Sequence, residues 1–377
     1  MATLQAVGTT NEKDGETKSE GENEENEVEV SEIYNRNSFI NGRGGRLVRI
    51  LSEFVGVQDS LRDEGIFFTV VVFGSSRALS KEKYELRKRR YERKLTKLNK
   101  KMENNVILID EELEEYERLK KDVEKLHKLK WTTDYYTKIF ELSKKLTLFF
   151  ATEEGKKAVN NISIHLPKVH NFLPNKKGEK SQNNFTVAIC TGGGPGFMEA
   201  ANKGSREANG RSLGFMISLP FEKGANQYVD KNLSFKFHYF FTRKFWLVYL
   251  SLAFIILPGG FGTLDELMEI LTLKQCKKFK RNVPIILFGK DFWSSILNFK
   301  KLAEYGLISQ DDLNCIFMTD SKYIHGGNSC GPPPPLPLCP IMHGIALTVQ
   351  QRVSSLRPHR CPCIREEGGV QHIRMCQ

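Results

Sequence analysis

One glutamate, Glu266, follows a glycine-rich turn at a spacing that suits chemistry beside a bound anion. The turn Pro258–Gly262 comes directly after the apolar run 253–257, and we expect a helix with Thr263, Asp265 and Glu266 in its first turn. Glycines let the backbone approach a ligand closely. A helix N-terminus offers unpaired N–H groups and a positive dipole end to a phosphate. A carboxylate is poorly placed to bind that phosphate, so we predict that Glu266 acts on a neighbouring atom.

The predicted anion site contains a second turn of this kind and a weaker third one. Residues Thr191–Gly196 follow the apolar run 186–190, and residues Gly74–Arg77 follow the apolar run 69–73. Three strand–turn–helix units predict a parallel sheet, whose ligands bind beyond the carboxyl ends of the strands. The substrate-binding residues predicted in the three turns are Gly74, Ser75, Ser76, Arg77, Gly192, Gly193, Gly194, Gly196, Gly259, Gly260, Gly262 and Thr263.

Neither glycine turn has the spacing of a triphosphate-binding P-loop or of a dinucleotide fingerprint. Triphosphate hydrolysis is therefore not favoured. Glu199 lies on the helix expected after the second turn. We consider it a candidate for binding ribose hydroxyls or the base edge, with an ordinary helix residue as the alternative.

The apolar runs predict an α/β fold, a doubly wound parallel sheet with helices on both faces. Later strands are expected at 213–219, 253–257, 283–288 and 315–319. A short helix over 46–59 is expected to pack at the sheet edge. A crossover helix over 134–152 should bury Tyr136, Phe140, Leu146 and Phe150. We expect one domain over residues 41–325, with a polar loop at 168–184.

A charged insertion of about fifty residues, roughly 81–131, follows the first strand. Residues 81–101 hold eleven Lys or Arg against three Glu, and 111–130 carry one apolar helical stripe formed by Tyr116, Leu119, Val123 and Leu126. These features predict two antiparallel helices in which acidic positions of the second offset the basic first. Arg87–Arg90 also resembles a nuclear localisation signal or a nucleic-acid contact, but few aromatic residues accompany it, and we favour a solvated hairpin.

The two ends of the chain differ in composition from the core. Residues 1–30 carry a net charge of −7 while the whole chain carries +11, and we interpret residues 1–40 as a disordered acidic tail. Residues 326–377 contain no Lys, four consecutive prolines and five of the eight cysteines. This abrupt change favours a disordered tail or a gene-model artefact.

Eight scattered cysteines do not form a disulfide framework in a chain of this length, which indicates a reducing, cytosolic compartment. The late His359, Cys361, Cys363, His372 and Cys376 lack the usual spacing of zinc ligands. We therefore predict no metal site. No apolar run approaches the ~20 residues of a membrane span.

Four motifs occur in order along the predicted sheet: Thr191–Asn202, Leu219–Glu222, Phe240–Lys244 and Pro258–Glu266. Together they resemble the Lonely Guy (LOG) family of nucleoside 5′-monophosphate phosphoribohydrolases, often labelled "lysine decarboxylase". The resemblance covers about residues 68–323 and is greatest to the longer branch, which has a charged insertion after the first strand. The family normally ends in a further helix, where this chain has Ser-Lys-Tyr-Ile-His at 321–325.

The resemblance implies a Rossmann-like fold, usually a homodimer, and AMP nucleosidase-type cleavage of AMP-like or cytokinin riboside 5′-monophosphates to free base and ribose 5-phosphate. The catalytic Arg and Glu of the family align with Arg243 and Glu266. Arg243 cannot give up its proton, so we expect it to hold phosphate, ribose or the departing base, with a structural salt bridge as the alternative. Glu266 would stabilise positive charge at C1′ and guide water. Lys244 is a further substrate-binding candidate, and no metal or cofactor is implied.

Two alternatives belong to other functional classes. A non-catalytic nucleotide carrier would use the same pocket, as fold relatives that bind molybdenum cofactor do. The presence of both Arg243 and Glu266 favours the enzyme. Decarboxylation of lysine would require a Schiff-base lysine for pyridoxal phosphate, and we find no such constellation. The preferred base cannot be read from the sequence.

Overall fold

The computed structural model describes residues 32–104, 109–164, 186–220, 224–279 and 283–320. The chain divides into two units, residues 1–49 and 50–377. In the first unit, η1 (Ile33–Asn35) and α1 (Asn37–Asn41) precede the start of α2 (Arg46–Asp63). Of the predicted tails and loop, residues 1–31, 168–184 and 326–377 lie outside the described residues, and the end of the acidic segment 1–40 forms η1 and most of α1.

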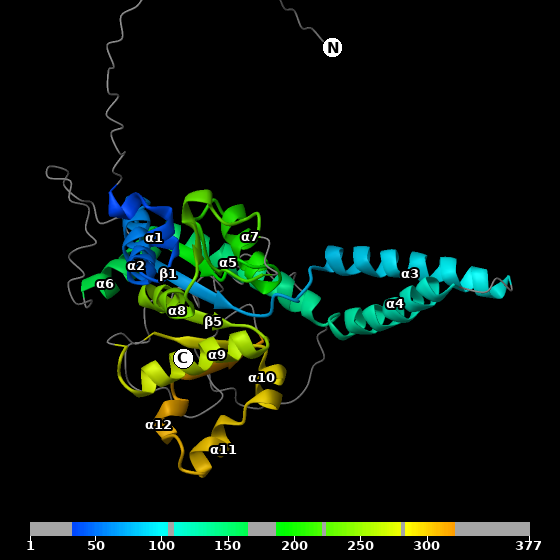
Figure 1. The fold of residues 1–377 in the computed structure, drawn as a ribbon. Helices are drawn as coiled ribbons and strands as arrows, with labels where there is room; N and C mark the ends of the chain where they lie inside the picture. The colour runs from blue at the N-terminus through cyan, green and yellow to red at the C-terminus, as the bar shows by residue number, and fades with distance from the viewer. Residues whose placement is uncertain (1–31, 105–108, 165–185, 221–223, 280–282, 321–377) are drawn as a thin grey trace, which may run out of the picture. The chain divides into compact units, whose positions relative to one another are not determined.

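The second unit is built around a seven-stranded parallel sheet in the order β4-β3-β2-β1-β5-β6-β7 (Figure 1). The predicted α/β Rossmann-like class is therefore confirmed. From β1 the chain adds strands first on one side, β2 to β4, and then on the other, β5 to β7. In parallel sheets such a reversal opens a crevice at the carboxyl ends of the two strands where it occurs, here β1 and β5. The strands are β1 (Ile66–Phe73), β2 (Thr186–Thr191), β3 (Ser212–Ile217), β4 (Ser234–Phe237), β5 (Ser251–Ile256), β6 (Ile285–Phe288) and β7 (Ile316–Thr319).

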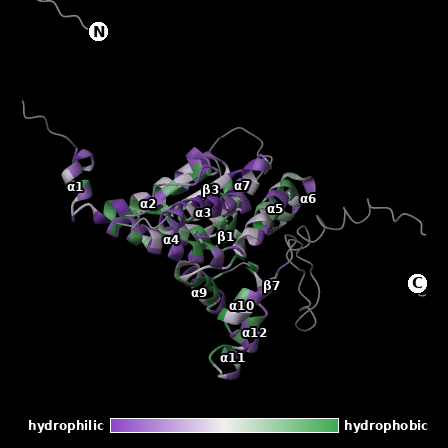
Figure 2. Ribbon diagram, turned by 90° about the vertical axis from the view of Figure 1, so that its right-hand side faces the viewer, coloured by the Kyte–Doolittle hydropathy of each residue, from purple (hydrophilic) through white to green (hydrophobic). Residues whose placement is uncertain are grey.

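Side chains of each strand alternate between two hydrophobic layers. In β1, Val71 and Phe73 join one layer, and Val70 and Val72 join the other. Helices α2, α8 and α9 cover the first layer, and α5 and α7 cover the second. The alternation of hydrophobic and hydrophilic residues along α2 and α5 can be followed in Figure 2. Besides α2 and the two helices of the charged insertion, this unit contains the helices α5 (Thr132–Ala151), α6 (Glu153–Ile164), α7 (Phe197–Glu207), η3 (Lys231–Leu233), α8 (Phe240–Tyr249), α9 (Phe261–Gln275), α10 (Lys290–Ile296), α11 (Phe299–Glu304) and α12 (Gln310–Leu313).

The helix predicted at 46–59 is α2, whose Val57 and Leu61 are buried in the same layer as Phe254 of a middle strand and Phe237 of the edge strand β4. Strand β4 was not foreseen, since its four residues form a partly exposed edge strand. In the crossover helix α5, Tyr136, Leu146 and Phe150 are buried as predicted, while Phe140 is only partly buried.

The charged insertion forms the predicted helical hairpin of α3 (Lys81–Glu103) and α4 (Asp110–Lys128), which Figure 1 shows extending from the carboxyl end of β1. The Nζ atom of Lys94 lies 2.5 Å from Oε1 of Glu115, and Lys101 pairs with Glu112. The apolar stripe of α4 faces inward, with Leu119 and Leu126 buried. The acidic arm thus neutralises part of the basic arm.

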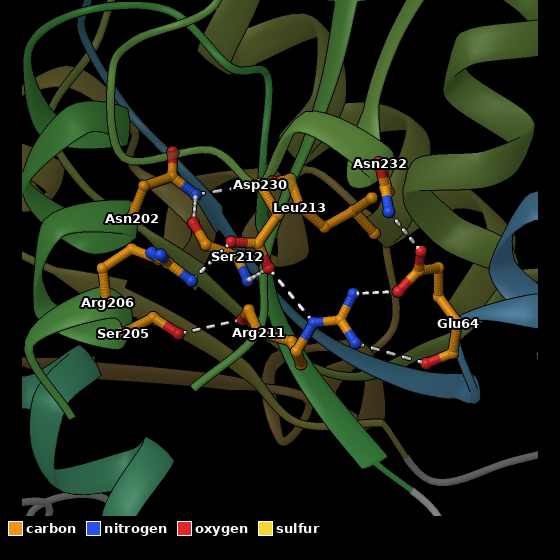
Figure 3. A network of polar contacts seen from close by, with 9 residues as sticks. All are labelled: Glu64, Asn202, Ser205, Arg206, Arg211, Ser212, Leu213, Asp230 and Asn232. Atoms are coloured by element: carbon orange, nitrogen blue, oxygen red, sulfur yellow. Dashed lines mark hydrogen bonds and ion pairs between the residues drawn. The ribbon is translucent and has the colours of Figure 1, made fainter. Parts of the chain in front are cut away.

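A polar network fixes the beginning of β3 to the elements around it (Figure 3). The Nε atom of Arg211 donates to Asp230 at 3.1 Å, and Arg206 pairs with the same carboxylate at 2.6 Å. Arg211 also binds Glu64, whose pKa is lowered by this hydrogen bond and by a second one from Asn232. These contacts lie at the amino-terminal end of the strand, opposite the predicted ligand edge.

No helix within the described ranges has the length and apolar character needed to cross a membrane.

Candidate active site

The three predicted turns meet at the carboxyl ends of β1, β2 and β5. The backbone N–H of Ser75 donates to the carbonyl of Pro258 at 3.0 Å, and that of Phe197 donates to the carbonyl of Ser75 at 3.2 Å. A Cβ atom on Gly196 would lie 2.3 Å from the same Ser75 oxygen, and its φ is +75°. Glycine is therefore required where the second turn crosses the first.

The triple-glycine turn rests on two asparagines that the sequence did not single out. The side-chain Nδ2 of Asn226 donates to the carbonyls of Gly193 and Gly194 at 3.1 and 3.0 Å. It also donates to Oδ1 of Asn202, which accepts a second bond from Thr191. Asn202 is fully buried on α7. These bonds hold the triple-glycine turn in place, because Asn202 links α7, β2 and the loop that carries Asn226.

Residues Gly74, Ser75, Ser76 and Arg77 occupy the turn after β1. A Cβ atom on Gly74 would lie 3.0 Å from both Leu257 and Phe197, so the turn runs close to its neighbours. Ser75 Oγ accepts from the Arg77 backbone N–H at 3.1 Å. Ser76 and Arg77 are exposed. Their side chains are available to a ligand at this edge.

Arg243 lies in the second turn of α8 and reaches the triple-glycine turn. Its Nε atom donates to the carbonyl of Phe215 at 2.8 Å. A Cβ atom on Gly192 would lie 2.7 Å from its Nη2 atom, so a larger residue there would displace the guanidinium. The backbone carbonyl fixes one side of the guanidinium, and no carboxylate among the described residues forms an ion pair with it. The predicted alternative of a structural salt bridge is therefore not what the geometry favours.

A glutamate that the sequence analysis missed, Glu53 of α2, holds the N-terminus of the helix that carries Arg243. One carboxylate oxygen of Glu53 accepts the backbone N–H of His238 at 2.7 Å, and the other accepts the hydroxyl of Thr242. Its backbone carbonyl accepts Nε1 of Trp246 at 3.0 Å. A carboxylate at this end also suits the helix dipole. The sequence offered no signal for these contacts, since almost two hundred residues separate the partners.

Helix α9 begins at Phe261, with Gly260 as its N-cap residue, and carries the predicted carboxylate one turn later than expected. Thr263 is buried in the first turn of α9, and that turn contains no acidic residue. Asp265 and Glu266 therefore belong to the second turn, which corrects the prediction. The helix begins directly at the glycines, because its N-cap is the second glycine of the turn rather than a polar side chain.

Glu266 has the environment of a group tuned for proton or charge chemistry. Its side chain is 5% exposed, and its Oε2 atom has no hydrogen-bond partner among the described residues. Burial raises the pKa of Glu266 to about 7, although the positive charges of Arg243 and Lys244 oppose the shift. The influence of both charges places the predicted catalytic pair in one electrostatic environment.

Lys244 lies between two carboxylates of α9. Its Nζ atom is 2.8 Å from Asp265 and 2.8 Å from Glu269. Burial acts to lower the pKa of Lys244, but the bonds to Asp265 and Glu269 outweigh it and the pKa is raised. Asp265 of α9 therefore forms an ion pair with α8.

Glu199 lies in the first turn of α7, immediately after the triple-glycine turn. It is 6% exposed, and both its oxygens accept bonds from Nζ of Lys83, at 2.6 and 2.8 Å. Lys83 belongs to the first turn of the inserted hairpin. The structure therefore brings a residue of the insertion to a predicted site residue.

The turn after β5 is shaped by Thr263. A Cβ atom on Gly259 would lie 2.1 Å from the Thr263 hydroxyl, whereas Gly260 and Gly262 have open space around them. The described residues contain no group of three or more His, Cys, Asp or Glu side chains arranged to hold a metal ion. The late His and Cys residues considered above lie outside the described part.

Part of the chain is similar to known proteins. A family model described as "Possible lysine decarboxylase" matches residues 198–323. The chain is 30% identical over 137 residues to the rice "Probable cytokinin riboside 5'-monophosphate phosphoribohydrolase LOG4" (Oryza sativa subsp. japonica), covering 35% of this chain and 57% of that protein. It is 44% identical over 59 residues to Arabidopsis thaliana LOG3, named as a cytokinin riboside 5'-monophosphate phosphoribohydrolase, covering 15% of this chain and 26% of that protein. These partial matches support assignment of the chain to the LOG family.

The LOG match covers part of the site described above. Residues 198–323 include Glu199, Arg243 and Glu266, together with α8, β5 and α9. They do not include β1, the hairpin or the turn Gly192–Gly196. The chain spans 57% of the rice relative and 26% of the Arabidopsis one. The turns after β1 and β2 lie outside the matched residues. The structure joins them to the matched part, because the turn after β1 is hydrogen-bonded both to the turn after β5 and to Phe197, which follows the turn after β2.

Proposed function

We propose that this LOG-family chain hydrolyses the N-glycosidic bond of AMP-like or cytokinin riboside 5′-monophosphates, giving free base and ribose 5-phosphate. The observation that carries the proposal is the buried Glu266 carboxyl, which has an unpartnered oxygen and a pKa of about 7, beside the Arg243 charge. The names of the relatives support the same reaction. A pure carrier has little use for a carboxyl tuned in this way.

The substrate phosphate is expected to bind at the N-termini of α7 and α9. Both helices begin directly at glycines of the turns and have no side-chain cap. In α7 the first N–H, that of Phe197, is bonded to the Ser75 carbonyl, so the phosphate is expected to use the N–H groups that follow it. Such helix ends favour anions. Ser75, Ser76 and Arg77 complete the phosphate site from the turn after β1, and Lys244 adds positive charge nearby.

Cleavage of the bond between C1′ and the base develops positive charge on the sugar, as in glycoside hydrolysis generally. The ionised Glu266 stabilises this charge and orients or deprotonates the attacking water. Arg243 remains charged throughout and holds the substrate by hydrogen bonds and charge, because it cannot act as a base. Glu199 is placed to accept hydrogen bonds from the ribose hydroxyls. No metal or cofactor takes part in these steps.

The test is chromatographic detection of free base released from AMP and from isopentenyl-AMP, with Glu266→Gln beside the wild type. Release by the wild type, lost in the variant while nucleotide binding remains, supports the reaction and the role of the carboxylate. Nucleotide binding without release by either protein would favour a carrier. Equal release by both would show that another carboxylate acts, and Glu199 would be replaced next.

The lysine decarboxylase activity named in the family description fits the site poorly. A pyridoxal phosphate enzyme needs a lysine that can lose its proton and form a Schiff base. Lys244, the lysine next to Arg243, is paired with Asp265 and Glu269, and its pKa is raised. Its ammonium form is therefore stabilised, which disfavours that chemistry.

The active assembly is proposed to be a homodimer. Helices α2 and α8 lie side by side, with the rings of Phe54 and Phe245 5.1 Å apart, and Lys244 joins α8 to α9. Within residues 50–377, these three helices expose seven large apolar side chains, which suits a second copy of the chain. They are Leu51, Val55, Phe240, Phe241, Phe245, Phe261 and Met268.

The dimer is tested by light scattering after size-exclusion chromatography. Phe261 is 92% exposed, so Phe261→Glu should leave the fold intact and shift the chain toward the monomer. A matched control is Leu307→Glu, an exposed apolar residue that is not on α2, α8 or α9. A wild-type monomer at micromolar concentration would contradict the proposal.

A cytosolic location is also proposed. Cys190, Cys276 and Cys315 are free thiols within the described part, which suits a reducing compartment. Fractionation of cells that express the native chain would test it, and recovery in a secreted fraction would contradict it.

A further inference from the structure

The inserted hairpin is joined to the proposed site by one ion pair, between Lys83 and Glu199. The two Nζ–carboxylate distances are 2.6 and 2.8 Å, so both carboxylate oxygens are engaged. Glu199 is 6% exposed, whereas the Lys83 side chain is 49% exposed. Lys83 therefore extends from the solvent-exposed surface to a buried carboxylate.

The hairpin reaches the site because of where it is inserted in the fold. It follows the turn Gly74–Arg77, at the carboxyl end of the central strand β1. The hydroxyl of Ser80 caps α3 by accepting the backbone N–H of Lys83 at 3.1 Å, which fixes the first turn of the helix. Leu79 is tied to α5 by a bond from its N–H to the Thr132 hydroxyl at 3.2 Å. The base of the hairpin is thus tied to α5.

The residue next to Glu199 on α7 lies at the triple-glycine turn. A Cβ atom on Gly192 would be 3.0 Å from the sulfur of Met198 and 2.7 Å from Nη2 of Arg243. Met198, Gly192 and Arg243 therefore lie close together at the end of β2, and Glu199 follows Met198 in the first turn of α7.

The ion pair decides the orientation of a carboxylate that the proposed reaction uses. A buried polar group without a partner is costly, and a carboxylate whose two oxygens both accept bonds from one ammonium group is held in one orientation. Resting on the proposed function, we propose that Lys83 is a positioning residue: it holds Glu199 oriented so that Glu199 accepts hydrogen bonds from the ribose hydroxyls of the nucleotide. The insertion then contributes directly to substrate binding.

The test compares KM and kcat for base release from AMP by the wild type, Lys83→Met and Lys83→Arg. Loss of a charged hydrogen bond is expected to raise the KM of Lys83→Met by about tenfold. The value of kcat changes little, because Lys83 does not act at C1′. Lys83→Arg keeps a bidentate donor and restores most of the KM.

A matched control separates this role from a merely structural one. Lys94→Met removes another hairpin ion pair, to Glu115 at 2.5 Å, away from the site, and should leave KM unchanged. In a double-mutant cycle with Glu199→Gln, the two KM effects should not add, because both variants remove the same interaction. Melting temperatures of all variants show whether a KM change merely follows loss of stability.

The outcomes distinguish this inference from the proposed function. If the wild type releases base and Lys83→Met keeps a wild-type KM, the role of Lys83 is wrong and the hydrolase remains. If the wild type binds AMP without releasing base, calorimetric Kd values replace KM, and an unchanged Kd in Lys83→Met overturns the inference. If the wild type neither releases base nor binds AMP, both proposals are wrong.

Discussion

Lys244 and Asp265 join the two helices that carry the proposed catalytic pair, with Nζ of Lys244 2.8 Å from Oδ2 of Asp265. Lys244 follows Arg243 on α8, and Asp265 precedes Glu266 on α9. The ion pair therefore fixes the two helices at the level of the site. Through its charge, Lys244 also lowers the pKa of Glu266, against the larger effect of burial.

The pH dependence of the proposed reaction follows from Glu266. The carboxylate must be ionised to stabilise positive charge, and its pKa is raised to about 7 by burial. We expect kcat/KM for AMP to rise about tenfold per pH unit below pH 7 and to level off above it. Initial rates between pH 5 and 9 test this. A limb near pH 4 would mean that an ordinary, exposed carboxylate is responsible.

Replacing Lys244 should move the acidic limb of the pH profile, the range in which kcat/KM rises with pH, to higher pH. Lys244→Met removes a positive charge that lowers the pKa of Glu266, so a higher pH is needed to ionise the carboxylate. The control is Lys301→Met, which removes an exposed lysine paired with Glu304 at 2.8 Å. It should leave the limb in place. A limb that moves down in Lys244→Met would contradict the electrostatic reading of the site.

Glu266 should also destabilise the fold at neutral pH. Its pKa is about 7 in the folded chain, above the ordinary value of 4.5, so the folded state binds this proton more tightly than the unfolded state. Stability linked to this group is present below pH 4.5 and is lost as pH rises to 7. Glu266→Gln should therefore be more stable than the wild type at pH 8, by about 3 kcal/mol.

Urea unfolding of both proteins at pH 4.5, 6 and 8 measures this difference. The gain in the free energy of unfolding should be largest at pH 8 and should nearly vanish at pH 4.5. An equal gain at all three pH values would reflect packing of the amide and not ionisation of the carboxyl.

Gly259 and Gly260 should respond differently to alanine, although they are neighbours. A Cβ atom on Gly259 would lie 2.1 Å from the Thr263 hydroxyl, whereas one on Gly260 meets nothing within 4 Å. Forcing Thr263 aside should reduce the free energy of unfolding by about 1–3 kcal/mol in Gly259→Ala. Gly260→Ala should stay within about 0.5 kcal/mol of the wild type. Thermal unfolding compares the two, and equal losses would argue against the close contact.

The sequence predicted well that the three turns lie at one edge of the sheet, because its signal is local. Each predicted turn combines an apolar run with glycines over about ten residues, and the structure brings all three turns together. The error at Glu266 is one of helix start: with Gly260 as N-cap, Thr263 is the third helical residue, and the acidic residues move to the second turn. A glycine N-cap gives no side-chain signal from which to place the boundary.

What the sequence could not predict are the contacts that hold the site residues in place. Asn226 supports the triple-glycine turn from 33 residues away, and Lys83 meets Glu199 across 116 residues. Such pairs depend on the order of the strands, which periodicity does not reveal. The site residues named from the sequence therefore lie in local motifs, and the residues that position them were not named.

Glu53 is the clearest of these missed positions and gives the last prediction. Its carboxylate accepts bonds from the His238 N–H and the Thr242 hydroxyl at the start of α8, one residue before Arg243. Glu53→Ala leaves these groups without their acceptor and should reduce the free energy of unfolding by about 1 kcal/mol. It should also lower kcat/KM, because the turn that orients Arg243 is no longer fixed.

Two further variants separate these effects. Glu53→Gln keeps one oxygen that can accept the His238 N–H, so it should retain more activity than Glu53→Ala. Asp59→Ala, on the same helix, removes only an exposed ion pair with Arg62 and should leave kcat/KM unchanged. If Glu53→Ala lowers the melting temperature but keeps the wild-type kcat/KM, then α8 holds Arg243 without this cap, through the bond from Arg243 Nε to the Phe215 carbonyl.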